Sequence, residues 1–245
     1  MADALHVHEF GPADGPVVVM LHGVTGHGGR FRRLAAEQLP GHRVIAPDLR
    51  GHGRSPSLPP WTLEQHAADV AAVLETRGLG PVPVVAHSFG GVVALHLPPE
   101  RVSSLLLLDP AVYVRPEDAL ANALSAGEAV ADRAQALAAQ RGDWPTASDD
   151  VIEEEVAAHW TQTERGWHPR YCPPAIATAW SEMCRPAPVP RVRAVMVRAL
   201  GAAYVGAEYL RACEGADVEV VDVDCGHVVY LERPERVGEL VAGLR

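Results

Sequence analysis

Short apolar runs alternate with amphipathic stretches along most of the chain. The apolar runs that predict strands cover residues 5–10, 17–21, 43–46, 82–85, 102–108, 193–199 and 218–223. Between them, residues 31–38, 63–77 and 91–97 predict helices, and in 63–77 the apolar positions recur at helical spacing. This alternation predicts an α/β fold with a mainly parallel sheet and helices on both faces.

Two of these runs have the pattern of central strands. Residues 82–85 and 105–108 are apolar at successive positions, as expected of a parallel strand that is covered on both faces. Ligands of such sheets bind beyond the carboxyl ends of the strands. We therefore expect chemistry in the residues that directly follow these two runs.

The alternation stops between residues 113 and 188, where the chain becomes alanine-rich and acidic. One or two helices are predicted over 117–141, and others over 149–163 and 175–183. We expect a helical cap over 113–188, inserted into a core domain of residues 1–112 and 189–245. Four tryptophans fall in the insertion, where they line a substrate pocket or form the core of the cap: Trp144, Trp160, Trp167 and Trp180.

Ser88 lies at the end of the 82–85 strand in the segment Ala86-His87-Ser88-Phe89-Gly90. A sharp turn from strand to helix needs small residues two positions before and after its centre, and Ala86 and Gly90 satisfy that need. Such a turn exposes the serine hydroxyl at the edge of the sheet. The segment is therefore a candidate nucleophile turn.

Two other segments carry chemistry in the same chain order. Leu21-His22-Gly23-Val24-Thr25-Gly26 follows a strand, and its glycines allow a turn that points a backbone N–H at a substrate oxygen. Cys225-Gly226-His227 follows the last strand and precedes a closing helix. The glycine-containing segment 47–55 is predicted to be a scaffold turn.

Together these segments resemble the α/β-hydrolase family, a resemblance that spans the chain outside the predicted cap. It implies a serine hydrolase with Ser88 as nucleophile and His227 as general base. It also implies an oxyanion hole formed by the backbone N–H groups of Val24 and Phe89.

The acid of a Ser-His-Asp triad is missing from its usual place. Family members usually carry it after the seventh strand, here 193–199, but the short loop that follows has no aspartate. Asp109 ends the neighbouring strand 102–108 and is our predicted acid. Glu208, Asp222 and Asp224 are alternatives. If no acid serves, the chain is a very weak enzyme or a non-catalytic descendant.

Composition limits the partners of the protein. The 245 residues carry a formal net charge of −10, which argues against binding nucleic acid through bulk electrostatics. No apolar run is long enough to span a bilayer, and the acidic start has no secretory pattern, so we expect a cytoplasmic protein. The four cysteines lack the spacing of zinc ligands, and we expect neither metal nor cofactor.

These observations predict an enzyme that cleaves carboxylic esters of small to medium, largely apolar acyl groups. The same residues are compatible with a lactonase, a thioesterase or a carbon–carbon bond hydrolase. A non-catalytic ligand-binding protein is the alternative from another class. The natural substrate and the oligomeric state are left open.

Overall fold

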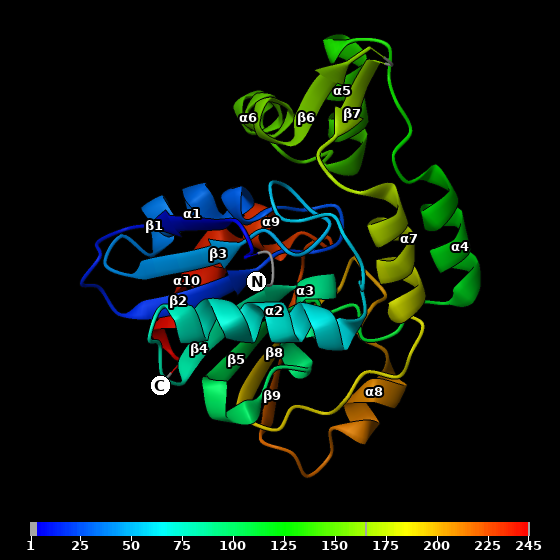
Figure 1. The fold of residues 1–245 in the computed structure, drawn as a ribbon. Helices are drawn as coiled ribbons and strands as arrows, with labels where there is room; N and C mark the ends of the chain where they lie inside the picture. Colours follow the sequence, from blue (N-terminus) through cyan, green and yellow to red (C-terminus); the bar gives the residue numbers. More distant parts are fainter. Residues whose placement is uncertain (1–3, 165, 245) are drawn as a thin grey trace.

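Seven strands form one sheet at the centre of the molecule (Figure 1). The structure is a computed structural model, and it describes residues 4–164 and 166–244. The spatial order is β1-β3-β2-β4-β5-β8-β9, with β1 antiparallel to β3 and all other neighbours parallel. The strands are β1 (Val7–Phe10), β2 (Val17–Leu21), β3 (Arg43–Pro47), β4 (Val82–His87), β5 (Val102–Leu108), β8 (Ala194–Ala199) and β9 (Val218–Val223). This arrangement confirms the predicted α/β class.

Side chains of the central strands alternate between two apolar layers. In β5, Leu105 and Leu107 pack in one layer, and Leu106 and Leu108 pack in the other. The first layer includes residues of α2 (Leu63–Thr76), α3 (Phe89–Leu95) and α8 (Ala207–Ala212). The second includes residues of η1 (Gly28–Phe31), α1 (Arg32–Gln38), α9 (Val229–Glu232) and α10 (Pro234–Ala242). A short η2 (Pro99–Arg101) precedes β5. Burial on both faces explains the continuous apolar runs in the sequence.

The longest helix, α2, illustrates how the sequence fixes its ends and its buried face. The Thr62 side chain accepts a hydrogen bond of 3.2 Å from the backbone N–H of Gln65, which satisfies one of the free N–H groups of the first turn. Leu63, Val70 and Leu74 are buried against the sheet. The predicted spacing of apolar residues therefore marks the face that packs on the core.

Between β5 and β8 the chain forms a separate layer above the carboxyl ends of the strands (Figure 1). Its elements are α4 (Pro116–Ser125), α5 (Arg133–Asp143), α6 (Asp149–His159), β6 (Trp160–Thr163), β7 (Gly166–Pro169) and α7 (Pro173–Glu182). The stretch 117–141 thus forms two helices, one of the two options that the sequence left open.

The prediction of a helix over 149–163 is wrong for the last four residues. The helix ends at His159, and Trp160–Thr163 pairs antiparallel with Gly166–Pro169. Gly166 has φ of 111°, a conformation that side-chain-bearing residues rarely adopt, at the start of the returning strand. The insertion is therefore not purely helical, because a β-hairpin follows α6.

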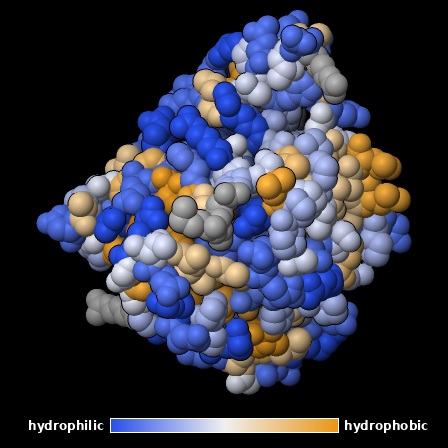
Figure 2. Space-filling view, in the orientation of Figure 1, coloured by the Kyte–Doolittle hydropathy of each residue, from blue (hydrophilic) through white to orange (hydrophobic). Residues whose placement is uncertain are grey.

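The two ends of this insertion differ in surface chemistry. Leu120 and Leu124 on α4 are 61% and 74% exposed, and Figure 2 shows a hydrophobic area over that helix at the right of the view. Where α6 faces α1, Figure 2 shows mainly hydrophilic residues. Ion pairs join these helices there, from Arg32 and Arg33 to Glu154.

Candidate active site

Ser88 occupies a strained turn between β4 and α3. Its φ of 53° and ψ of −120° lie outside the regions that a serine normally adopts. The surrounding backbone holds it there, because Ser88 N–H donates to the carbonyl of Leu108, and the Ser88 carbonyl accepts from Gly91 and Ala111. Such strain costs about 1–3 kcal/mol and persists only where neighbouring structure enforces it. The predicted sharp turn from strand to helix is therefore present in the structure, with Ser88 at its centre.

Glycine is required at two positions after this serine. A Cβ atom on Gly90 would lie 2.5 Å from the carbonyl oxygen of His22 at the end of β2. A Cβ atom on Gly91 would lie 2.7 Å from Cβ of Pro110. The close approach of two neighbouring strand ends explains why the segment after Ser88 begins Phe-Gly-Gly.

Ser88, His227 and Asp109 form a continuous chain of hydrogen bonds. The Ser88 hydroxyl lies 2.9 Å from Nε2 of His227, and Nδ1 of the same ring lies 2.6 Å from Oδ2 of Asp109. Asp109 is fully buried, and its Oδ1 accepts a bond of 3.2 Å from the backbone N–H of Ala199. With Nδ1–H donating to the carboxylate, Nε2 is left to accept the serine proton.

The three alternative carboxylates lie elsewhere. Glu208 is exposed on α8, and Asp224 is exposed after β9. Asp222 forms a surface ion pair of 2.6 Å with Arg198. Both nitrogens of the His227 imidazole are already engaged by the serine and by Asp109. Of the four carboxylates considered from the sequence, the structure brings Asp109 to the histidine.

Two aromatic neighbours of His227 were not predicted. The ring of Tyr204, from the short loop after β8, lies 4.3 Å from the His227 ring, centre to centre. His87 donates from Nε2 to the backbone carbonyl of His227 over 2.9 Å, and burial lowers the pKa of His87 well below its ordinary value. His87 is therefore neutral beside His227. Its place next to Ser88 in the sequence is a signal that could have suggested a role at the site.

The loop after β2 packs directly against the serine. A Cβ atom on Gly23 would lie 3.0 Å from Cβ of Ser88, and Val24 lines the same cavity as the serine. Phe89 is the first residue of α3, so its N–H has no acceptor within the helix. The structure thus places both predicted oxyanion-hole residues beside the nucleophile turn, and their role remains a prediction.

Buried side chains fasten this loop to the scaffold. Nε2 of His22 accepts from the N–H of Leu49 over 2.9 Å, and its Nδ1 donates to the carbonyl of Gly23 over 2.7 Å. Asp48 accepts from the N–H groups of Gly28 and Arg54. The segment 47–55 therefore serves the scaffold role that its glycines suggested.

A cavity of about 450 Å³ opens above Ser88 and is roofed by residues of the insertion. Trp144, Trp160 and Trp180 line it, and Trp160 also belongs to a small apolar cluster with Ala136 and Val156, against which Trp167 packs. Three of the four tryptophans thus line the cavity, and two of the four, Trp160 and Trp167, contribute to the insertion's own core. Polar side chains also line the cavity, so its wall is less apolar than the sequence suggested.

One buried ion pair joins the insertion to the core beside this cavity. Arg30 donates from Nε and Nη2 to Oε1 of Glu155 on α6, over 2.9 and 2.7 Å. Nε2 of His27 lies 3.2 Å from Oε2 of the same carboxylate. Burial raises the pKa of Glu155, but Arg30 and His27 outweigh burial and hold that pKa well below its usual value.

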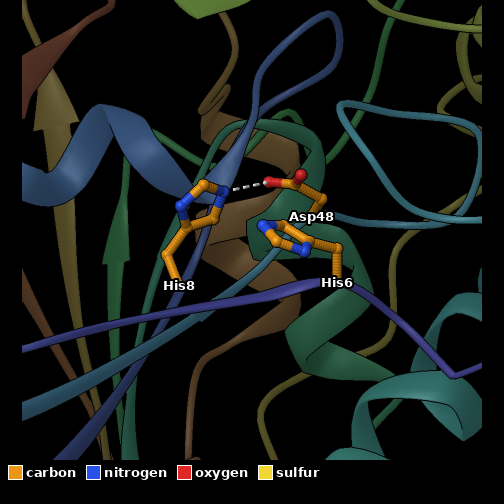
Figure 3. Close-up of side chains that lie close together, drawn as sticks. All are labelled: His6, His8 and Asp48. Atoms are coloured by element: carbon orange, nitrogen blue, oxygen red, sulfur yellow. Dashed lines mark hydrogen bonds and ion pairs between the residues drawn. The ribbon is translucent and has the colours of Figure 1, made fainter.

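In the part of the chain that the structure describes, two groups of side chains have the donor atoms and proximity for a metal ion, although no metal was expected. Figure 3 shows the first, His6, His8 and Asp48 at the edge of the sheet, where Nε2 of His8 lies 3.0 Å from Asp48. The second is His27, Glu155 and His159. In the first group, Asp48 already accepts hydrogen bonds from loop backbone N–H groups. In the second, Glu155 already accepts hydrogen bonds from Arg30. These bonds account for the positions of both carboxylates without an ion.

Comparison with known proteins identifies the family to which this fold and this arrangement of side chains belong. Residues 18–240 match the alpha/beta hydrolase family, and the chain belongs to that family. It is an enzyme of the lipase and esterase-like kind within it.

Particular relatives give the same result. The chain is 40% identical to Lipase LipV of Mycobacterium tuberculosis (strain ATCC 25618 / H37Rv), across 97% of this chain and 96% of that protein. The fold is similar to that of E-2-(acetamidomethylene)succinate hydrolase, with a TM-score of 0.85 and 23% identity across 98% of this chain and 94% of the other. It is also similar to a marine microorganism esterase, with a TM-score of 0.79 and 18% identity over the whole of both chains.

Within residues 4–164 and 166–244, no helix has the length and apolar character needed to cross a membrane.

Proposed function

We propose that this protein is a serine esterase that hydrolyses carboxylic esters of small to medium acyl groups. Ser88 is the nucleophile, His227 the general base and Asp109 the acid that orients the imidazole. The observation that carries the proposal is the continuous chain of hydrogen bonds, 2.9 Å from serine to histidine and 2.6 Å from histidine to aspartate. These distances are within the range that proton transfer requires.

In this mechanism the Ser88 hydroxyl attacks the ester carbonyl while Nε2 of His227 takes its proton. Asp109 holds the imidazole in the tautomer that can accept this proton and stabilises the imidazolium that forms. The N–H groups of Val24 and Phe89 donate to the developing oxyanion. The imidazolium then protonates the departing alcohol, and water releases the acyl group by the same steps in reverse.

The neighbouring His87 supports this chemistry because it stays uncharged. Burial keeps its pKa low, so a second positive charge does not accumulate beside the imidazolium. Its bond to the His227 backbone carbonyl also fixes the loop that carries the base.

Residues 113–188 act in this proposal as a cap over the serine, and residues 1–112 with 189–245 act as the core domain. The substrate is a small molecule, because the cavity between them measures about 450 Å³. The acyl chain enters under the cap, beside the tryptophans that line it.

The non-catalytic alternative rested on a missing acid, and the bond between Asp109 and His227 weighs against it. Lactone, thioester and carbon–carbon substrates of the same fold share this machinery. They become the next substrates to assay if simple esters fail.

A rate series on p-nitrophenyl esters from acetate to dodecanoate tests the proposal, with the Ser88→Ala protein as control. We expect turnover by the wild type with an optimum at short to medium chains, and a loss of at least about 10⁴-fold in the variant. Turnover that survives Ser88→Ala would contradict the proposal, and absence of turnover across the series would exclude simple esters.

A further inference from the structure

A His-x-His pair lies at the antiparallel edge of the sheet. His6 directly precedes β1 and His8 lies within it, and residues two apart on an extended chain point to the same side. Val7 pairs with Pro47 of β3, and the N–H of Asp48 donates to the carbonyl of His6 over 2.9 Å, which continues the register by one pair. The two histidines and Asp48 therefore meet on one face, as Figure 3 shows.

The donor atoms of this group lie close enough to share one ion. One atom from each of the three side chains lies within 4.8 Å of the other two. Nε2 of His8 is already 3.0 Å from Oδ1 of Asp48. Bonds of about 2.0–2.1 Å to a tetrahedral zinc ion place ligand atoms about 3.3 Å apart, so the group closes around an ion with movements of about 1–2 Å.

The two imidazole rings can take part in binding. Within residues 4–164 and 166–244, the His6 ring has no hydrogen-bond partner. The rings of His6 and His8 lie 4.7 Å apart, centre to centre, and both residues are partly exposed. An ion can therefore reach both rings from solvent.

Asp48 is held in place for such a role. Its carboxylate is buried and accepts hydrogen bonds from the backbone N–H groups of Gly28, over 2.7 Å, and Arg54, over 2.9 Å. Carboxylates that bind metal ions are usually held by bonds of this kind. Both bonds can persist when an ion replaces the proton between His8 and Asp48.

The charges around the group permit a divalent cation. Asp48 supplies a negative charge, and histidines bind metals as neutral rings. Arg54 places a positive charge near His6, but Arg54 is exposed, so solvent screens that charge. The net charge of −10 on the whole chain also favours the approach of a cation.

The group of His27, Glu155 and His159 suits an ion less well. All three residues are buried, which restricts entry from solvent. The Glu155 carboxylate is also bound at 2.7 Å by the guanidinium of Arg30, whose charge repels a cation. Access and charge therefore both favour the group at the edge of the sheet.

We propose that His6, His8 and Asp48 form a binding site for Zn²⁺, with water as the fourth ligand. Zinc takes imidazole nitrogen and carboxylate oxygen together, whereas Ca²⁺ and Mg²⁺ prefer oxygen ligands alone. The site uses no cysteine, so the cysteine spacing does not bear on it. Its role is structural, because it joins β1 to the turn after β3 that also holds Gly28.

Isothermal titration calorimetry with ZnCl₂ tests the site on the intact chain, after EDTA treatment and dialysis. We expect one ion per chain with a Kd of about 1–100 µM, weaker than a four-ligand structural site. CaCl₂ and MgCl₂ should give no binding in this range. Co²⁺ should occupy the same site and show the visible absorption of a tetrahedral complex.

Substitutions assign the binding to these residues. His6→Gln and His8→Gln each remove one imidazole and keep a polar side chain, and each should weaken Zn²⁺ binding by at least about tenfold. His42→Gln is the matched control, because His42 is also partly exposed but lies outside the group. Asp48 is left intact, since its bonds to the loop backbone also support the fold.

Thermal unfolding measures the structural role. With Zn²⁺ at a hundredfold excess over Kd, the unfolding midpoint of the wild type should rise by about 5–10 °C, because the ion binds the folded chain. EDTA should reverse this rise, and His6→Gln should remove most of it.

A Kd weaker than about 100 µM would overturn the site, as would binding that both His6→Gln and His8→Gln leave unchanged. Equal affinity for Ca²⁺ and Zn²⁺ would overturn the ligand set. Binding without a rise in the unfolding midpoint would overturn the structural role. These readouts do not involve Ser88 or ester turnover, so they are independent of the esterase proposal.

Discussion

The two sides of the cavity differ in how their polar side chains are hydrogen-bonded. On the core side, the polar groups of Ser88, His227 and Asp109 are bonded to one another and to backbone. On the side of the insertion, Nδ1 of His159 and Nε1 of Trp160 are buried with no hydrogen-bond partner within residues 4–164 and 166–244. Groups fixed by partners hold the one geometry that a reaction needs, whereas buried unpaired groups lower the stability of the region that contains them.

The largest expected effect comes from breaking the core side. Asp109→Asn removes the carboxylate that orients the His227 ring, and we expect kcat/KM for p-nitrophenyl esters to fall by up to about 10⁴-fold. Circular dichroism should show an intact fold. Asp222→Asn is the matched control, since this aspartate lies on the surface and should leave the rate unchanged. Similar rates for both variants would remove Asp109 from the mechanism.

A second experiment removes the buried ion pair that joins the two sides of the cavity. Glu155→Gln leaves the buried Arg30 charge without its partner, and removing one member of a buried ion pair costs about 3–5 kcal/mol. We expect a lower free energy of unfolding in urea, together with faster proteolysis of the insertion.

Glu154→Gln provides the comparison for that experiment. Glu154 pairs with Arg32 and Arg33 on the surface, where such pairs contribute less than about 1 kcal/mol. Equal losses from the two substitutions would show that the buried pair is not what holds the insertion against the sheet layer.

A smaller effect comes from an unpaired histidine in the core. His66 in α2 is fully buried against Phe89, and within the described ranges neither ring nitrogen has a hydrogen-bond partner. Burial lowers the pKa of His66 to about 3, so between about pH 6.5 and 3 the unfolded chain binds a proton that the folded chain does not. Stability therefore falls as pH falls through this window, by about 1.4 kcal/mol per pH unit.

His66→Phe should remove this contribution without changing substrate preference. We expect the stability difference between variant and wild type, measured by urea unfolding, to shift in favour of the variant by about 2 kcal/mol from pH 6.5 to pH 5. His42→Gln, in the turn before β3, controls for loss of a histidine elsewhere. A difference that stays constant with pH would contradict a neutral buried His66.

Much of the core could be predicted because its strands are continuous apolar runs that a parallel sheet requires. Asp109 could be selected from sequence because the end of its strand had to lie beside the end of the serine's strand. The positions of Tyr204 and His87 against the His227 ring depend on loop conformations that no local pattern encodes.

The insertion between β5 and β8 was predicted less well than the sheet. The 149–163 stretch continues the helical pattern, and only pairing with Gly166–Pro169, across a turn, makes Trp160–Thr163 a strand. The ion pair from Arg30 to Glu155 joins residues 125 positions apart, so its formation could not be inferred from spacing. Sequence alone also gave no sign that Gln140 would face the serine's cavity.

The most direct measurement of the proposed triad is covalent labelling of the intact protein with diethyl p-nitrophenyl phosphate, followed by mass spectrometry of the whole chain and its peptides. An activated serine displaces p-nitrophenolate and keeps the diethyl phosphoryl group. We predict one adduct per chain, on Ser88, with none on the Ser88→Ala protein and much slower labelling of Asp109→Asn. An unlabelled wild type, or an adduct on another residue, would contradict the assignment of Ser88 as the nucleophile.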